Sequence, residues 1–153
     1  MSDEFKELKE DILAEQGEIE EAIRRLLLIR NDQLKSHNDY VSIPAIGTYL
    51  MNFYNGVENI LKRICKVYYQ SPILKSSGWH KELLDSAYQP PQGKYPIFSR
   101  PVVERYQYKN FRHRFISGYG YQLKIEKMVE LINNLDSLWV EIKNELNVFL
   151  GKL

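Results

Sequence analysis

The feature that most constrains the fold is an apolar repeat at helical spacing that runs through three long segments of the chain. In the first, residues 3–36, apolar side chains recur every three or four positions and no proline interrupts them. Such steps keep side chains on one stripe of a helix. We therefore expect a helix over residues 3–36, about 50 Å long at a rise of 1.5 Å per residue. Its stripe consists of Phe5, Leu8, Ile12, Ile19, Ala22, Ile23, Leu26 and Ile29.

Proline, glycine and serine divide the rest of the chain into further helices. Ser42 and Pro44 predict the start of a second helix, since Ser caps helix N-termini and Pro fits the first turn. Ser71-Pro72 predicts its end. We expect a short helix over residues 78–87, a loop over residues 89–101, a fourth helix starting at Ser99 and Pro101, and a last helix over residues 121–150.

No segment alternates apolar and polar residues as a half-buried strand does, so the sequence predicts an all-α fold. Long helices joined by short connections favour an up-and-down antiparallel bundle of four to five helices. At 153 residues the chain fits a single domain, residues 1–153.

The composition excludes several classes of protein. Cys65 is the only cysteine, so no internal disulfide forms, and its apolar neighbours suggest that it fills the core. One Cys and three scattered His do not make a structural zinc site. The sequence also contains no glycine-rich loop of the kind that binds the phosphates of a cofactor. No run approaches the ~20 apolar residues that cross a bilayer. We expect a cytoplasmic protein with no metal, no cofactor and no membrane contact.

The net charge of +1 hides an asymmetry between two segments. Residues 1–21 hold nine acidic residues and two lysines, whereas residues 94–114 hold six cations and one glutamate. One interpretation is two solvated helix faces of opposite sign. The other is that the basic segment meets phosphate.

The stretch "FRHRFISGYGYQL", residues 111–123, is the strongest candidate for a site. If the fourth helix continues through it, Arg112 and Tyr119 share one face, and His113 and Ser117 lie one turn apart on a neighbouring face. Arg suits bidentate phosphate binding. The chemistry therefore fits a phosphate or nucleic-acid contact, and the alternative is a boundary helix with packed aromatics and solvated cations.

This stretch resembles the signature of the HEPN superfamily, specifically the HepT-like toxins that pair with minimal nucleotidyltransferases. Their motif is Arg, four residues, His, any residue, Tyr, often within "FRHxFRHxYGxEL". Arg112 and Tyr119 fill the Arg and Tyr positions, and Ser117 stands at the His position. "YNGVENILKRI" (54–64) and "SGWHKELLDSA" (77–87) resemble two further segments of the family, with Glu58 at its usual acidic position.

The resemblance implies a homodimer that cleaves tRNA or mRNA without metal, as the toxin of a toxin–antitoxin pair. It implies that Arg112 binds phosphate, that the group at position 117 acts as general acid or base, and that the partner modifies Tyr119 with AMP. A serine hydroxyl does not exchange protons usefully near pH 7, so His113, one turn earlier, is a candidate substitute. Arg105, Lys109 and Arg114 are candidate RNA contacts. The alternative function is a non-catalytic subunit that binds the nucleotidyltransferase.

Three residues outside the motif also need an interpretation, and for two of them the sequence leaves two possibilities. Glu58 is either an ordinary boundary residue or a buried polar group with a partner. His80 caps or lines the bundle, or has a functional role. Trp139 lies in the apolar stripe of the last helix and is expected in the core.

Overall fold

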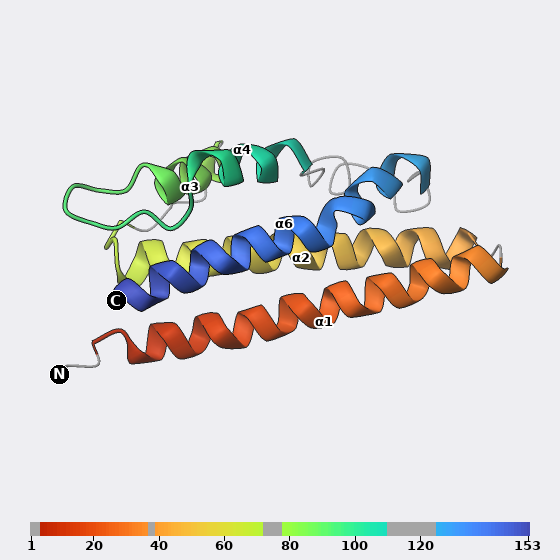
Figure 1. The fold of residues 1–153 in the computed structure, drawn as a ribbon, viewed down its shortest axis with the longest axis horizontal. Helices are drawn as coiled ribbons and strands as arrows, with labels where there is room; N and C mark the ends of the chain where they lie inside the picture. Colours follow the sequence, from red (N-terminus) through yellow and green to blue (C-terminus); the bar gives the residue numbers. More distant parts are fainter. Residues whose placement is uncertain (1–3, 37–38, 72–77, 110–124) are drawn as a thin grey trace.

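The computed structural model describes residues 4–36, 39–71, 78–109 and 125–153 (Figure 1). Within these residues every regular element is a helix. The order is α1 (Lys6–Ser36), α2 (Asp39–Val67), α3 (Trp79–Tyr88), α4 (Arg100–Lys109) and α6 (Ile125–Lys152). The predicted all-α bundle is confirmed, and the helices lie close to the residue ranges that the apolar repeats predict.

The helices form three layers, with α2 and α6 in the middle (Figure 1). The long helix α1 packs antiparallel along α2 on one side, and α3 and α4 cover the other side. One cluster of buried apolar side chains draws residues from all five described helices. Cys65 and Trp139 belong to this cluster, as expected from their place in the apolar stripes.

The helices α1 and α2 are in tight contact at a glycine. A Cβ atom added to Gly56 would lie 2.4 Å from Cγ1 of Ile19, which is far inside van der Waals contact. A residue with a Cβ atom here would require the Ile19 side chain or the helix backbones to shift. The sequence therefore uses Gly56 to bring α2, the central helix, against α1.

The prediction for the start of α2 is wrong. The helix begins at Asp39, three residues before Ser42, and Pro44 lies inside it. Pro44 lacks the N–H that would donate to the carbonyl one turn earlier, which weakens the helix locally. Ile46 and Leu50 are fully buried just beyond it, so core packing holds the turn in place despite the missing bond.

The proline-rich segment between α3 and α4 is tied to the bundle. The Tyr69 hydroxyl donates to the carbonyl of Tyr95 at 2.8 Å, and the Tyr95 N–H donates to the Tyr68 hydroxyl at 3.1 Å. Ile97 and Phe98 are buried. This segment fixes where α4 starts relative to the end of α2.

Candidate functional site

The motif residues Arg112, His113, Arg114, Ser117 and Tyr119 lie outside the described residues, so their predicted roles stay predictions. The helix that precedes them in the chain, α4, is described through Lys109. Next to this helix, the described residues include a polar cluster in the core, centred on the buried Glu58.

A buried carboxylate connects three helices at this cluster. Glu58 of α2 is 2% exposed. Its Oε1 lies 2.8 Å from Nδ1 of His80 on α3, and its Oε2 accepts a hydrogen bond of 2.9 Å from the hydroxyl of Tyr106 on α4. A buried charge is tolerated only with such partners. Of the two interpretations of Glu58, the structure therefore supports the buried group with partners.

The partners of Glu58 differ in their exposure to solvent. Tyr106 is buried at 2% exposure, and its hydroxyl also lies 3.3 Å from the carbonyl oxygen of Tyr54. The side chain of His80, in contrast, is 41% exposed. The cluster thus reaches from the core to the surface through the imidazole of His80.

An aromatic ring and a cation flank this imidazole. The rings of Trp79 and His80 have centroids 3.5 Å apart, and Nζ of Lys62 lies 4.2 Å from the centroid of the Trp79 ring. Such a cation–π contact contributes about 0.5–1 kcal/mol at an exposed site. An imidazole, an indole and an ammonium group therefore meet on one partly exposed surface of α2 and α3.

Gly78 places Trp79 and His80 in the first turn of α3. It adopts a left-handed conformation with φ of 84°, just before the helix begins. A residue with a Cβ atom disfavours that conformation. The chain therefore turns sharply at Gly78, and His80 enters the bundle beside Glu58.

Sequence reasoning missed the contact between Glu58, His80 and Tyr106. Glu58 and His80 are 22 residues apart, and Glu58 and Tyr106 are 48 residues apart. The available signal was Glu58 within the apolar stripe of α2, which indicates a buried charge that needs donors. The sequence around Glu58 does not show which donors bind its carboxylate.

The described cations of the basic segment 94–114 have intramolecular contacts. Nζ of Lys94 lies 4.8 Å from the centroid of the Tyr68 ring, and Arg100 pairs with Glu104 at 2.9 Å. Arg105 pairs with Glu141 of α6 at 2.6 Å and donates to the Ser137 hydroxyl. Arg105 therefore ties α4 to α6. The side chain of Lys109 lies outside the description.

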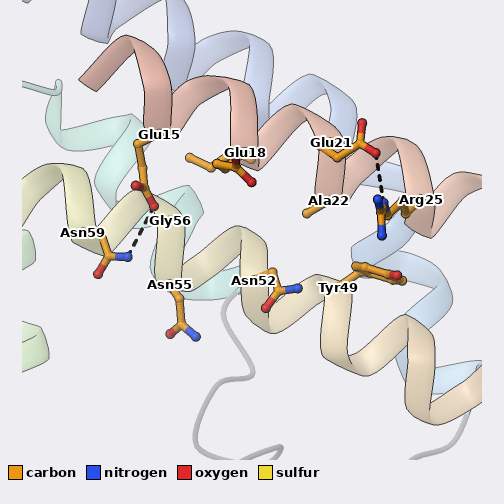
Figure 2. Close-up of a pocket in the computed structure, with 11 residues that line it drawn as sticks. Glu15, Glu18, Glu21, Ala22, Arg25, Tyr49, Asn52, Asn55, Gly56 and Asn59 are labelled. Carbon is orange, nitrogen blue, oxygen red and sulfur yellow. Dashed lines mark hydrogen bonds and ion pairs between the residues drawn. The ribbon is translucent and has the colours of Figure 1, made fainter. Parts of the chain in front are cut away.

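A groove of about 460 Å³, lined mostly by charged and amide residues, lies between α1 and α2 (Figure 2). Figure 2 shows Glu15 of α1 hydrogen-bonded to Asn59 of α2, and Glu21 paired with Arg25 at the other end. Hydrogen bonds from Arg24 and then Arg25 lower the pKa of the exposed Glu21 carboxyl to about 2. The described lining of this groove contains neither a histidine nor a cysteine, and its titratable groups are three glutamates, Arg25 and Tyr49.

In the described part of the chain, no group of three or more His, Cys, Asp or Glu side chains is arranged to hold a metal ion. None of the described helices is long and apolar enough to cross a membrane.

Comparison with known protein families gave a match. The family model described as HepT-like protein matches residues 45–153, which include α2 from its first turns onward and the whole stretch from residue 111 to residue 123. No curated protein and no solved structure matched the chain.

Proposed function

The chain belongs to the HepT-like protein family, and on this premise we propose that it is the RNA-directed member of a toxin–antitoxin pair. It acts in the cytoplasm as a homodimer and cleaves tRNA or mRNA without a metal ion, and its partner is a minimal nucleotidyltransferase. The observation that carries the proposal is that the family match runs through the stretch "FRHRFISGYGYQL".

Arg112 and Tyr119 have separate roles in this proposal. Arg112 binds the scissile phosphate and stabilises the negative charge that develops on it in the transition state. Tyr119 is the site where the partner attaches AMP. The adduct adds bulk and negative charge, so it blocks the approach of RNA.

Ser117 separates this chain from family members that carry histidine in the motif. A serine hydroxyl is a poor proton acceptor near pH 7, and losing a general acid–base group typically lowers a rate by ~10²–10⁴. The proposed reaction therefore needs another proton acceptor or runs slowly.

Cleavage of total tRNA by the purified protein in EDTA tests the proposal. We expect the wild type to cut, Arg112→Ala to lower the rate by about 10²–10³, and Ser117→His to raise it. Arg24→Ala is the matched control, because it removes one exposed arginine of α1 that pairs with Glu21.

Each outcome of this assay has a defined meaning. Equal rates for the wild type and Arg112→Ala would point to a contaminating nuclease. Cleavage by Ser117→His alone would mean that the natural protein is a silenced nuclease. If none of the proteins cuts RNA, the nuclease proposal is refuted.

The second candidate is a non-catalytic subunit that binds the nucleotidyltransferase, and Ser117 at the acid–base position favours it. Its test is co-expression with the minimal nucleotidyltransferase from a neighbouring gene, followed by purification and mass spectrometry of both proteins. We expect a stable complex and an adenylyl group on Tyr119, absent from Tyr119→Phe. Separate elution and an unmodified Tyr119 would count against this candidate.

A further inference from the structure

We propose that His80 is the proton acceptor of the reaction, held in place by Glu58 and Tyr106, and that single-stranded RNA reaches it beside α2 and α3. The inference rests on the proposed function, because it names the group that moves the proton in that reaction. It assigns a catalytic role to a residue outside the motif at residues 112–119.

The hydrogen bonds of Glu58 fix the tautomer of His80. An ionised carboxylate only accepts hydrogen bonds, and Glu58 meets a different donor at each of its two oxygens. Nδ1 of His80 therefore carries a proton toward Oε1. A neutral His80 then has its lone pair on Nε2, which is the tautomer that a general base requires.

The exposure of His80 allows a substrate to reach this lone pair. Its side chain is 41% exposed, whereas that of Glu58 is 3% exposed. Among the described residues, Nε2 of His80 has no hydrogen-bond partner. A buried carboxylate that orients an exposed imidazole is the arrangement found where histidine transfers protons.

The surroundings of His80 suit an RNA strand. Lys62 of α2 places a positive charge over Trp79, next to the imidazole, and a phosphate is attracted to such a charge. Among the described residues of the helices packed against α3, the titratable groups in this cluster are Glu58 and Lys62 from α2 and Tyr106 from α4. In the sequence, Arg112 follows Tyr106 by six residues, so α4 precedes the motif directly.

The proton-transfer step needs no oxidant, reductant or metal. Nε2 of His80 takes the proton from a ribose 2′-hydroxyl, and the 2′-oxygen forms a bond to the adjacent phosphorus. The bond from phosphorus to the 5′-oxygen breaks, and that oxygen takes a proton from water. The products are a 2′,3′-cyclic phosphate and a free 5′-hydroxyl, and His80 returns its proton to solvent. Glu58 and Tyr106 touch no reacting atom and act as positioning residues.

His80→Asn tests the role of the imidazole. The Asn amide can still donate to Glu58, but it offers no basic nitrogen at Nε2. We expect the rate of RNA cleavage to fall by about 10²–10⁴, the acidic limb of the pH–rate profile to disappear, and the melting temperature to stay near that of the wild type. Ser86→Ala, which removes a hydroxyl bonded within α3, is the matched control and keeps the wild-type rate.

Glu58→Gln tests positioning. We expect kcat to fall while KM stays unchanged, because the amide no longer accepts both hydrogen bonds but RNA contacts remain. Equal loss of soluble protein and of activity would mean a merely structural role and would overturn the positioning role.

A binding readout accompanies the kinetics. Single-stranded RNA with 2′-O-methyl groups, which cannot be cleaved, is mixed with wild-type protein, and modification of His80 by diethyl pyrocarbonate is measured by peptide mass spectrometry. We expect RNA to protect His80. Modification at an unchanged rate would overturn the inference, even if the protein cleaves RNA.

The outcomes separate this inference from the proposed function. If the wild type cuts RNA and His80→Asn cuts at a similar rate, the nuclease proposal stands and the role of His80 is wrong. If the wild type does not cut RNA, the nuclease proposal fails and the acid–base role fails with it, whether or not RNA covers His80.

Discussion

At the scale of single residues, Glu58 has two described hydrogen-bond partners, His80 and Tyr106. Of these two, Tyr106 is the one that is fully buried. In Tyr106→Phe the ring still fills its place, but Oε2 of Glu58 loses this donor. A buried acceptor that loses a donor costs about 1–3 kcal/mol. We expect urea unfolding to show a loss of that size, with the slope against urea concentration unchanged.

Tyr95→Phe is the matched control for that substitution, since the Tyr95 side chain is 48% exposed and its recorded hydrogen bonds use backbone atoms. We expect its free energy of unfolding to stay within about 0.5 kcal/mol of the wild type. If Tyr106→Phe were equally neutral, the carboxylate of Glu58 would not depend on this hydroxyl.

At the scale of elements, two glycines in helices should respond to alanine in opposite directions. Gly17 of α1 has no atom within 4 Å of an added Cβ, so Gly17→Ala should stabilise the protein by up to about 1 kcal/mol. Gly56→Ala gains the same helix propensity but presses a methyl group into Ile19. Overpacking costs about 1–3 kcal/mol, so we expect net destabilisation.

Thermal unfolding followed by circular dichroism at 222 nm measures both substitutions. The informative quantity is the sign of each shift in melting temperature: upward for Gly17→Ala and downward for Gly56→Ala. Two upward shifts would mean that α1 and α2 separate at little cost, and the close approach at Gly56 would then not hold the pair together.

The same scale shows where sequence signals for helix ends succeed and fail. Ser99 and Pro101 predict the start of α4 correctly, and the structure adds that Glu145 of α6 accepts hydrogen bonds from the N–H and the hydroxyl of Ser99. Ser42 and Pro44 predict the start of α2 wrongly. The helix continues through Pro44 because burial of the residues after it outweighs the local cost of a proline in a helix. Local signals thus fail where tertiary packing competes with them.

At the scale of the whole molecule, periodicity predicts the bundle but not the contacts that give the site its chemistry. Apolar stripes at steps of three and four show which face of each helix is buried, and a bundle follows from them. The contacts of Glu58 with His80 and Tyr106 depend on how α3 and α4 are placed over α2. That placement follows from the turn at Gly78 and from the anchored segment before α4, neither of which has a periodic signal.

The compact core also predicts how stability changes with alkaline pH. Burial raises the pKa of the Cys65 thiol to about 11 from 9.0. Well below pH 9 the thiol is neutral in both the folded protein and the unfolded chain, so its contribution to the free energy of unfolding does not depend on pH. Between pH 9 and pH 11 the unfolded chain loses this proton while the folded protein keeps it, and the free energy of unfolding therefore falls as the pH rises.

Comparison of wild type with Cys65→Ala isolates this contribution, since alanine does not titrate. Burial also raises the pKa of Tyr54 and Tyr69 above the ordinary value of 10.0, so these tyrosines lower stability in both proteins mainly above pH 10. Between pH 9 and pH 10 we expect the free energy of unfolding in urea to fall by about 1 kcal/mol more in the wild type than in Cys65→Ala. The variant starts from a lower stability because its smaller side chain leaves a cavity, so the comparison uses the two slopes rather than the absolute values. Parallel slopes would mean that the Cys65 thiol ionises as easily in the folded protein as in the unfolded chain, and that the C-terminal end of α2 is open to solvent at this residue.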